Sequence, residues 1–92
     1  MMFVVVSYDI PDDRRRTRVC NLLKNYGAHV QYSVFECNLK EKDYAAMRKR
    51  LERLIAEEED NVRFYFLCRE DVKRVRWIGK RGVATDADYY LH

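Results

Sequence analysis

The hydrophobic positions of the chain alternate between strand-like and helix-like spacing. A near-continuous apolar run over residues 2 to 8 predicts a buried strand, which Pro11 ends. Asp12 or Asp13 then caps a helix that we expect Gly27 to end. The apolar positions of this helix follow the i, i+3, i+4, i+7 spacing of one buried face: Val19, Leu22, Leu23 and Tyr26. The first part of the chain therefore predicts a strand followed by an amphipathic helix.

The remaining pattern predicts two more strands, a second helix and a last strand. Residues 28 to 39 are rich in β-branched and aromatic side chains, which favours two short strands, or one strand with a sharp break near Tyr32 and Ser33. A helix is expected over about residues 41 to 58, then a turn at Asp60 and Asn61, and then a strand over residues 62 to 68. This order predicts an α+β protein, the ferredoxin-like βαββαβ fold, with two helices on one face of a four-stranded antiparallel sheet.

The length of the chain predicts one domain over residues 1 to 92 and a second copy as partner. Domains of this size bury only about 60% of their unfolded surface, so a two-fold symmetric homodimer is expected. Residues 69 to 92 remain once the sheet is complete. Their apolar positions predict an extra C-terminal strand that is exchanged in the homodimer: Val72, Val75, Trp77 and Ile78. This strand would pair with the partner's sheet edge and bury Trp77, the only tryptophan of the chain.

Charge and cysteine content narrow the class of protein. The net charge is only +3, but basic side chains gather in residues 10 to 18 and 69 to 81, which indicates a patterned surface. Cys20, Cys37 and Cys68 lack zinc-binding spacing and are interpreted as small hydrophobic residues of a reducing compartment. No apolar run reaches the roughly 20 residues of a membrane span, and no signal peptide precedes the first strand. A soluble, cytoplasmic protein without a membrane partner is expected.

Asp9, at the end of the first predicted strand, is the candidate metal ligand. Hard divalent cations such as Mg²⁺, or alternatively Mn²⁺, prefer carboxylate oxygens. One carboxylate per chain makes a sparse site, but a two-fold dimer would supply two. A metal ion held there would lower the pKa of a bound water and polarise a phosphoryl oxygen. The alternative interpretation is that Asp9 caps the following turn or pairs with an arginine.

An arginine cluster without a lysine occupies the first turns of the predicted helix and is the candidate nucleic-acid contact: Arg14, Arg15, Arg16 and Arg18. The guanidinium fork matches phosphate geometry better than an ammonium group does, and the helix N-terminus adds a partial positive charge. Arg14 and Arg18 lie four residues apart and share one helix face. The alternative is an ordinary solvated helix surface.

Two aromatic residues near these charges have two interpretations. Tyr8 and Phe35 are either core residues or, if exposed, rings that stack on a base or form the floor of the site. The sequence by itself leaves both open.

Several motifs together resemble one known family. They are Tyr8-Asp9-Ile10, the run from Asp13 to Arg18, Tyr26-Gly27, and the stretch from Gln31 to Glu36. These motifs are similar to those of the CRISPR-associated endoribonuclease family, the small subunit that bridges the CRISPR integrase during spacer acquisition. The resemblance implies a ferredoxin-like fold, a homodimer with an exchanged C-terminal strand, and a Mg²⁺ site built from Asp9 of each chain. The implied activity is metal-dependent cleavage of single-stranded RNA or double-stranded DNA.

By position, the resemblance places Tyr8 and Phe35 in the catalytic site beside Asp9. It also places Arg16 and Arg18 on the substrate backbone, and Arg14 and Arg15 there by adjacency only. His29 stands where some members carry an arginine, so one substrate contact of the family differs in this chain.

The resemblance leaves two functional descriptions open. In one, the protein is a nuclease that requires Asp9. In the other, it is a non-catalytic scaffold that holds a duplex on its arginines and joins integrase subunits. We expect the scaffold role to be general and the nuclease activity to be conditional. A toxin-type ribonuclease relative with the same fold is the competing class, whereas an RNA-recognition module would need a signature that residues 62 to 66 lack.

Overall fold

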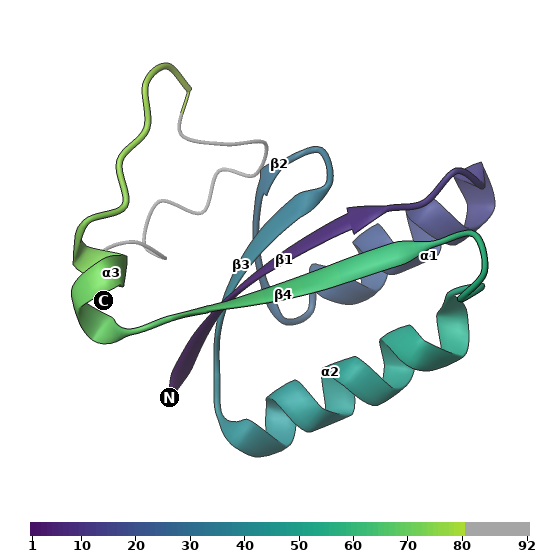
Figure 1. Cartoon of the computed structure of the whole chain (residues 1–92), viewed down its shortest axis with the longest axis horizontal. Coiled ribbons are helices and arrows are strands. Elements are labelled where there is room, and N and C mark those ends of the chain that lie inside the picture. The colour runs from purple at the N-terminus through teal and green to yellow at the C-terminus, as the bar shows by residue number, and fades with distance from the viewer. Residues whose placement is uncertain (81–92) are drawn as a thin grey trace.

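An antiparallel sheet with helices on one face forms the body of the protein (Figure 1). The computed structural model describes residues 1–80. Its strands are arranged in the order β2-β3-β1-β4: β1 (Met2–Asp9), β2 (Gly27–Gln31), β3 (Val34–Leu39) and β4 (Asn61–Leu67). Helices α1 (Asp13–Leu23) and α2 (Glu41–Leu54) pack on the sheet, and a short helix α3 (Arg69–Lys73) follows β4. The element order confirms the ferredoxin-like α+β fold.

The hydrophobic core lies between the sheet and the two long helices. Alternation along β1 turns every second side chain toward the helices, and the β1–β3 register places Val4 opposite Cys37 and Val6 opposite Phe35. The helices contribute Val19 and Leu23 from α1 and two further residues from α2, Met47 and Leu51. Each fully buried side chain of this kind contributes about 1.5 to 3 kcal/mol to folding.

Helix α1 begins as the sequence predicts but ends earlier. Asp12 is the N-cap, and its side chain accepts a hydrogen bond from the backbone N–H of Arg15. The helix ends at Leu23 with Lys24 as its C-cap, so the prediction that Gly27 ends it is wrong. Gly27 instead begins β2, where a Cβ would collide with the Glu36 carbonyl oxygen and with the Cys37 sulfur. The glycine is needed because β2 and β3 approach closely at this point.

The middle of the chain follows the prediction with one shorter helix. The two strands predicted over residues 28 to 39 are β2 and β3, and the break between them is the turn at Tyr32 and Ser33. Helix α2 ends at Leu54 rather than at residue 58, because Ile55 is extended and residues 57–59 form a turn that leads into β4. Within residues 1–80, no helix is long and apolar enough to cross a membrane.

The segment after β4 differs from the predicted extra strand. Val72 lies in α3, and residues 74–80 form neither helix nor strand in the single chain. Helix formation here has a local reason, since Glu70 and Asp71 place acidic side chains in the first turn and Lys73 a basic one in the last. Trp77 is 46% exposed in this arrangement. Exchange of residues 69–92 with a second subunit stays a prediction, and its part over residues 81–92 lies outside the described residues.

The three cysteines are free thiols in three different environments. Cys37 is buried, and burial raises the pKa of its thiol to about 12. Cys20 is partly buried against the core, as expected of a small hydrophobic residue. Cys68 is exposed and its thiol donates to Oδ2 of Asp71 at 3.1 Å, so the interpretation of all three as small hydrophobic residues is wrong for Cys68.

Candidate nucleic-acid interface

One end of the sheet brings together the segments that carry the predicted site residues. Strand β1 ends at Asp9, and α1 begins four residues later at Asp13. The β2–β3 turn lies at the same end, since the backbone N–H of Tyr8 donates to the carbonyl of Ser33 at 3.1 Å. Strand β4 begins there as well, with Asn61 opposite Asp9 in the β1–β4 register. Any chemistry of Asp9 would therefore take place between the first turn of α1 and the β2–β3 turn.

The carboxylate of Asp9 is exposed at the end of β1. Asp12, not Asp9, caps α1, and the Asp9 side chain makes no hydrogen bond or ion pair with residues 1–80. Asp9 thus neither caps the following turn nor pairs with an arginine in the described part of the chain. The carboxylate is available to a ligand.

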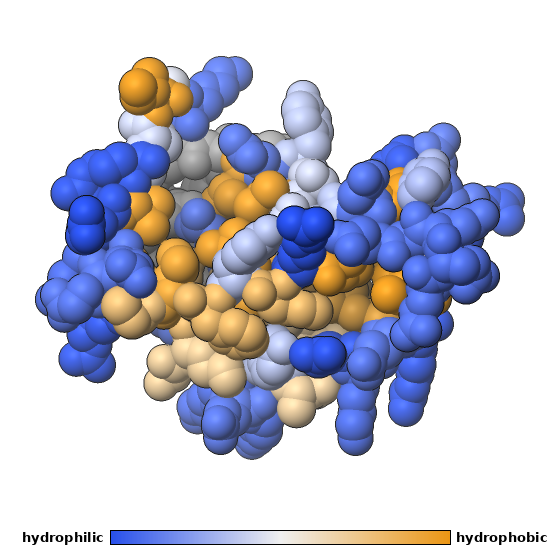
Figure 2. Space-filling view, viewed as in Figure 1, coloured by the Kyte–Doolittle hydropathy of each residue, from blue (hydrophilic) through white to orange (hydrophobic). Residues whose placement is uncertain are grey.

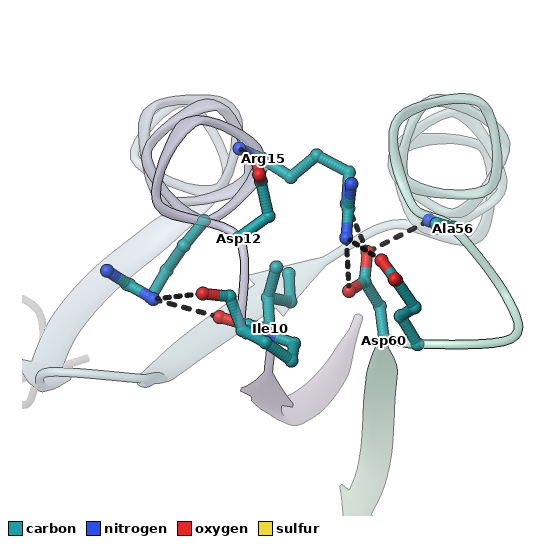
Figure 3. A network of polar contacts seen from close by, with 8 residues as sticks. Ile10, Asp12, Arg15, Ala56 and Asp60 are labelled. Carbon is teal, nitrogen blue, oxygen red and sulfur yellow. Dashed lines mark hydrogen bonds and ion pairs between the residues drawn. The ribbon is translucent and has the colours of Figure 1, made fainter.

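Arg15 belongs to a clamp between α1 and the loop that precedes β4. Its Nε donates to Oδ2 of Asp60 at 2.8 Å and its Nη2 to Oδ1 at 3.1 Å, so guanidinium and carboxylate form a bidentate pair. Nη2 also bonds Oε2 of Glu59 at 2.7 Å, and the backbone N–H of Ala56 donates to Asp60 at 2.9 Å. Figure 3 shows Arg15 reaching from its helix to Asp60 and away from the free surface of α1.

The charges of this clamp stabilise each other. The Asp60 side chain has no exposed surface, whereas that of Glu59 is 60% exposed. The hydrogen bonds from Arg15, supported by the Ala56 N–H, lower the pKa of Asp60 below its ordinary value of 3.8. The hydrogen bonds to Asp60 and then to Glu59 raise the pKa of Arg15. A guanidinium held by two carboxylates has little left to offer a phosphate, so we leave Arg15 out of the proposed interface.

Arg16 is used mainly to fix the chain between β1 and α1. Its Nη1 donates to the carbonyl of Ile10 at 2.9 Å and to that of Pro11 at 3.4 Å, and its Nη2 pairs with Asp13. The side chain remains 44% exposed. Arg16 therefore fixes α1 to the connection that follows Asp9, and a phosphate contact by this residue stays a prediction.

Arg14 and Arg18 differ from their neighbours because they point into solvent. Both are exposed, they lie four positions apart on one face of α1, and neither forms an ion pair or side-chain hydrogen bond with the described residues. These two unpaired guanidinium groups lie in the first turns of a helix, close in sequence to the free carboxylate of Asp9, and are available to an anionic ligand.

Tyr8 and Phe35 are core residues. Tyr8 is 4% exposed and Phe35 has no exposed surface, with their ring centroids 6.4 Å apart. Burial, followed by a hydrogen bond with Cys20, raises the pKa of Tyr8, so its hydroxyl stays protonated at neutral pH. That hydroxyl donates to the carbonyl of Tyr32 at 3.1 Å. The stacking role considered for these two rings required exposure, which the structure does not give them.

His29 and Tyr32 complete the site on the side of β2. His29 stacks on Phe35 with ring centroids 4.4 Å apart and parallel planes, and its Nε2 lies 3.0 Å from the carbonyl oxygen of Tyr32. The side chain of Tyr32 is 89% exposed. The sequence predicts a break at Tyr32 and a turn at Asp60 but a functional role for neither residue. The hairpin position of Tyr32 was a usable signal, whereas nothing local marks Asp60, which lies beside a run of glutamates.

Comparison with known proteins identifies the family. The family model described as CRISPR associated protein Cas2 matches residues 2–75. The chain belongs to the Cas2 family. A curated relative from Synechocystis sp., CRISPR-associated endoribonuclease Cas2 3, is 47% identical over 75 residues, which cover 82% of each chain. The family resemblance seen in the sequence motifs is confirmed.

Solved structures of the Cas2 family share the fold. Streptococcus pyogenes Cas2, crystallised at pH 6.5, matches with a TM-score of 0.77 and 35% identity over 85% of this chain and 100% of that chain. A chain of a partial Cas6-RT-Cas1–Cas2 complex matches with a TM-score of 0.75 and 30% identity over 92% of this chain and 99% of that one. The four-stranded sheet and its helices are thus a Cas2 fold.

Proposed function

We propose that this member of the Cas2 family acts in CRISPR spacer acquisition as a homodimer that binds nucleic acid and bridges the CRISPR-associated integrase. The observation that carries the proposal is the pair of free arginines, Arg14 and Arg18, on the helix that follows the strand ending at the free carboxylate of Asp9. The integrase partner is supported by the relative that belongs to a Cas6-RT-Cas1–Cas2 complex. The ligands expected are double-stranded DNA and single-stranded RNA.

The homodimer is supported by the face of the sheet that the helices leave open. Val5 and Tyr65 lie on this face, opposite one another in the β1–β4 register. Figure 2 shows hydrophobic side chains gathered over β4 and β1, with hydrophilic groups around them. Strand β4 is also a sheet edge within the described residues, and its Phe66 is 55% exposed. A second copy that covers this face and edge would remove both from water.

A magnesium site is the more demanding part of the proposal. Among the described residues no cluster of three or more possible ligands occurs, and each chain offers the single carboxylate of Asp9. Mg²⁺ is commonly held by one or two carboxylates together with substrate phosphates, so Asp9 from each of two chains fits this ion, with Mn²⁺ as the alternative. Bound there, the ion would polarise a phosphoryl oxygen and lower the pKa of a water for phosphodiester cleavage.

Different residues of the chain would have different roles at such a site. Asp9 would supply the ligand oxygens, while Arg14 and Arg18 would bind phosphates of the same nucleic acid. Tyr8 does not serve as a base, because its raised pKa keeps the hydroxyl protonated and its proton is donated to the Tyr32 carbonyl. It positions the turn instead. Arg16 fixes the β1–α1 connection that carries Asp9.

A scaffold without catalysis is the second function that the structure favours. Arg14 and Arg18 carry their charge whether or not Asp9 binds a metal ion. Within the described residues, neither arginine forms an ion pair or hydrogen bond with Asp9. We therefore propose that nucleic-acid binding and integrase bridging are general and that cleavage is conditional on assembly of a site from two chains.

The variant Asp9→Ala separates the two functions. Cleavage of single-stranded RNA and double-stranded DNA in Mg²⁺ should be lost, whereas DNA binding and spacer integration by the reconstituted integrase should remain. Glu41→Ala is the matched control, because it removes an exposed carboxylate from the start of α2 at the other end of the sheet. Loss of both cleavage and integration would contradict a general scaffold role. Unchanged cleavage would show that Asp9 does not take part in the reaction.

A further inference from the structure

An exposed aromatic ring lies beside Asp9 although the predicted stacking residues are buried. Tyr8 and Phe35 are inaccessible to a base, whereas Tyr32 is 89% exposed at the β2–β3 turn. A tyrosine of this exposure keeps both ring faces in water, which is unfavourable for an apolar surface unless a ligand covers it. Tyr32 is the best placed aromatic side chain at this end of the sheet for contact with a ligand.

The strand register places Tyr32 at the end of the sheet where Asp9 lies. Strands β1 and β3 are antiparallel, with Ser7 opposite Val34 as the last paired residues. The bond from the Tyr8 N–H to the Ser33 carbonyl lies one step beyond this pair. Tyr32 and Ser33 form the turn that leads back to β2, so Tyr32 lies in the turn next to the end of β1 that carries Asp9.

The backbone under Tyr32 is held from two sides. Its carbonyl oxygen accepts the Tyr8 hydroxyl at 3.1 Å and lies 3.0 Å from Nε2 of His29. His29 is itself held by its stacked contact with Phe35. The turn therefore presents an exposed ring on a fixed backbone. A ligand that covers this ring orders few additional groups, which favours binding.

We propose that Tyr32 is a stacking platform for one unpaired base of a single-stranded nucleic acid whose phosphates contact Arg14 and Arg18. The proposal rests on the nucleic-acid function proposed above and adds the residue that distinguishes a single strand from a duplex. A base within a duplex has both faces covered by its neighbours, whereas an unpaired base can place one face on a tyrosine ring. Tyr8 and His29 are positioning residues, because they hold the turn and do not contact the base.

Binding of matched single-stranded and duplex ligands by the full chain tests this assignment. Tyr32→Ala should weaken binding of a 12-nucleotide single-stranded RNA by about tenfold and leave binding of a duplex DNA of equal length unchanged. Tyr32→Phe and Tyr32→Trp keep a stacking ring and should retain the single-strand affinity. Gln31→Ala alters the exposed neighbour in the same hairpin and is the matched control. Thermal unfolding of each variant verifies that the fold is intact.

The outcomes separate this inference from the proposed function. If Tyr32→Ala leaves single-strand binding unchanged, or weakens both ligands equally, the stacking assignment is wrong while nucleic-acid binding stands. If the wild-type chain binds duplex but no single strand, the same conclusion holds. Failure of the wild-type chain to bind either ligand contradicts both proposals. If only binding of the integrase falls, Tyr32 is a protein contact and the inference is overturned.

Fluorescence gives a second and independent readout. The chain has one tryptophan, Trp77, so Trp77→Phe combined with Tyr32→Trp reports only from position 32. Addition of single-stranded RNA should quench this emission, because a stacked base lies against the indole ring, and duplex DNA should quench it far less. Equal quenching by both ligands would contradict selection of an unpaired base.

Discussion

Arg15 and Arg16 differ from Arg14 and Arg18 in what their charges do, although all four lie within the first turns of α1. Arg15 is held by Asp60 and Glu59, and Arg16 by carbonyl groups of the β1–α1 connection. The guanidinium groups of Arg14 and Arg18 have no such partner among the described residues. Arg15 and Arg16, the inner pair, therefore stabilise the fold. Arg14 and Arg18, the outer pair, are available to bind nucleic acid.

The difference shows that a cluster of like charges in a sequence need not form one functional surface. Helix geometry directs Arg15 and Arg16 away from the face that Arg14 and Arg18 share. Which side meets a carboxylate is then decided by Asp60, which lies 45 residues from Arg15 in the sequence. The free arginines are identified by the absence of a partner in residues 1–80, and this requires the tertiary structure.

The largest contrast in stability is expected between Arg15→Ala and Arg14→Ala. Removal of the Arg15 side chain leaves the fully covered Asp60 carboxylate without its cation, and an uncompensated buried charge is strongly destabilising. The midpoint of thermal unfolding should fall by several degrees in Arg15→Ala and stay unchanged in Arg14→Ala, a matched loss of one exposed arginine from the same helix. Equal shifts in the two variants would contradict the division into inner and outer arginines.

A smaller effect is expected in the pH dependence of stability. The folded state lowers the pKa of Asp60, so between that pKa and about 3.8 the unfolded chain binds more protons than the folded one. The contribution of Asp60 is therefore fully present above about pH 4 and is lost as the pH falls through the folded pKa. Asp60→Asn cannot titrate at this position. Its difference in unfolding midpoint from the wild type should be largest near neutral pH and should narrow below about pH 4.

Glu59→Gln is the control for this titration. The Glu59 side chain is largely exposed, so its replacement should change the unfolding midpoint little at any pH. A gap between wild type and Asp60→Asn that stays constant from pH 7 to pH 2 would show that the lowered pKa of Asp60 does not contribute to stability.

The fold was largely predictable because its signals are local. Alternation and β-branched residues indicate the strands, the spacing of apolar residues indicates the helices, and Asp12 marks the start of α1. One miss has a non-local cause, since Gly27 lies in β2 because of the close approach of β3. Exchange of residues 69–92 with a second chain stays a prediction.

The candidate site was less predictable than the fold. The exposure of Asp9 agrees with its predicted role as a ligand, but its metal ion stays a prediction. Burial of Tyr8 could have been derived from the sequence, because alternation places it on the same face as Val4 and Val6. The assignments of Arg15 and Tyr32 could not, since they depend on Asp60 and on the register between β1 and β3.

The salt dependence of duplex DNA binding tests the outer arginines most directly. Two arginines from each of two chains should give a slope of log affinity against log salt of about −3.5. Arg14→Ala combined with Arg18→Ala should bring this slope close to zero with the fold intact. The control combines Lys49→Ala with Arg50→Ala on the exposed surface of α2, which removes the same charge and should keep the wild-type slope. An unchanged slope in the Arg14 and Arg18 variant would contradict the assignment of these residues to the nucleic-acid interface.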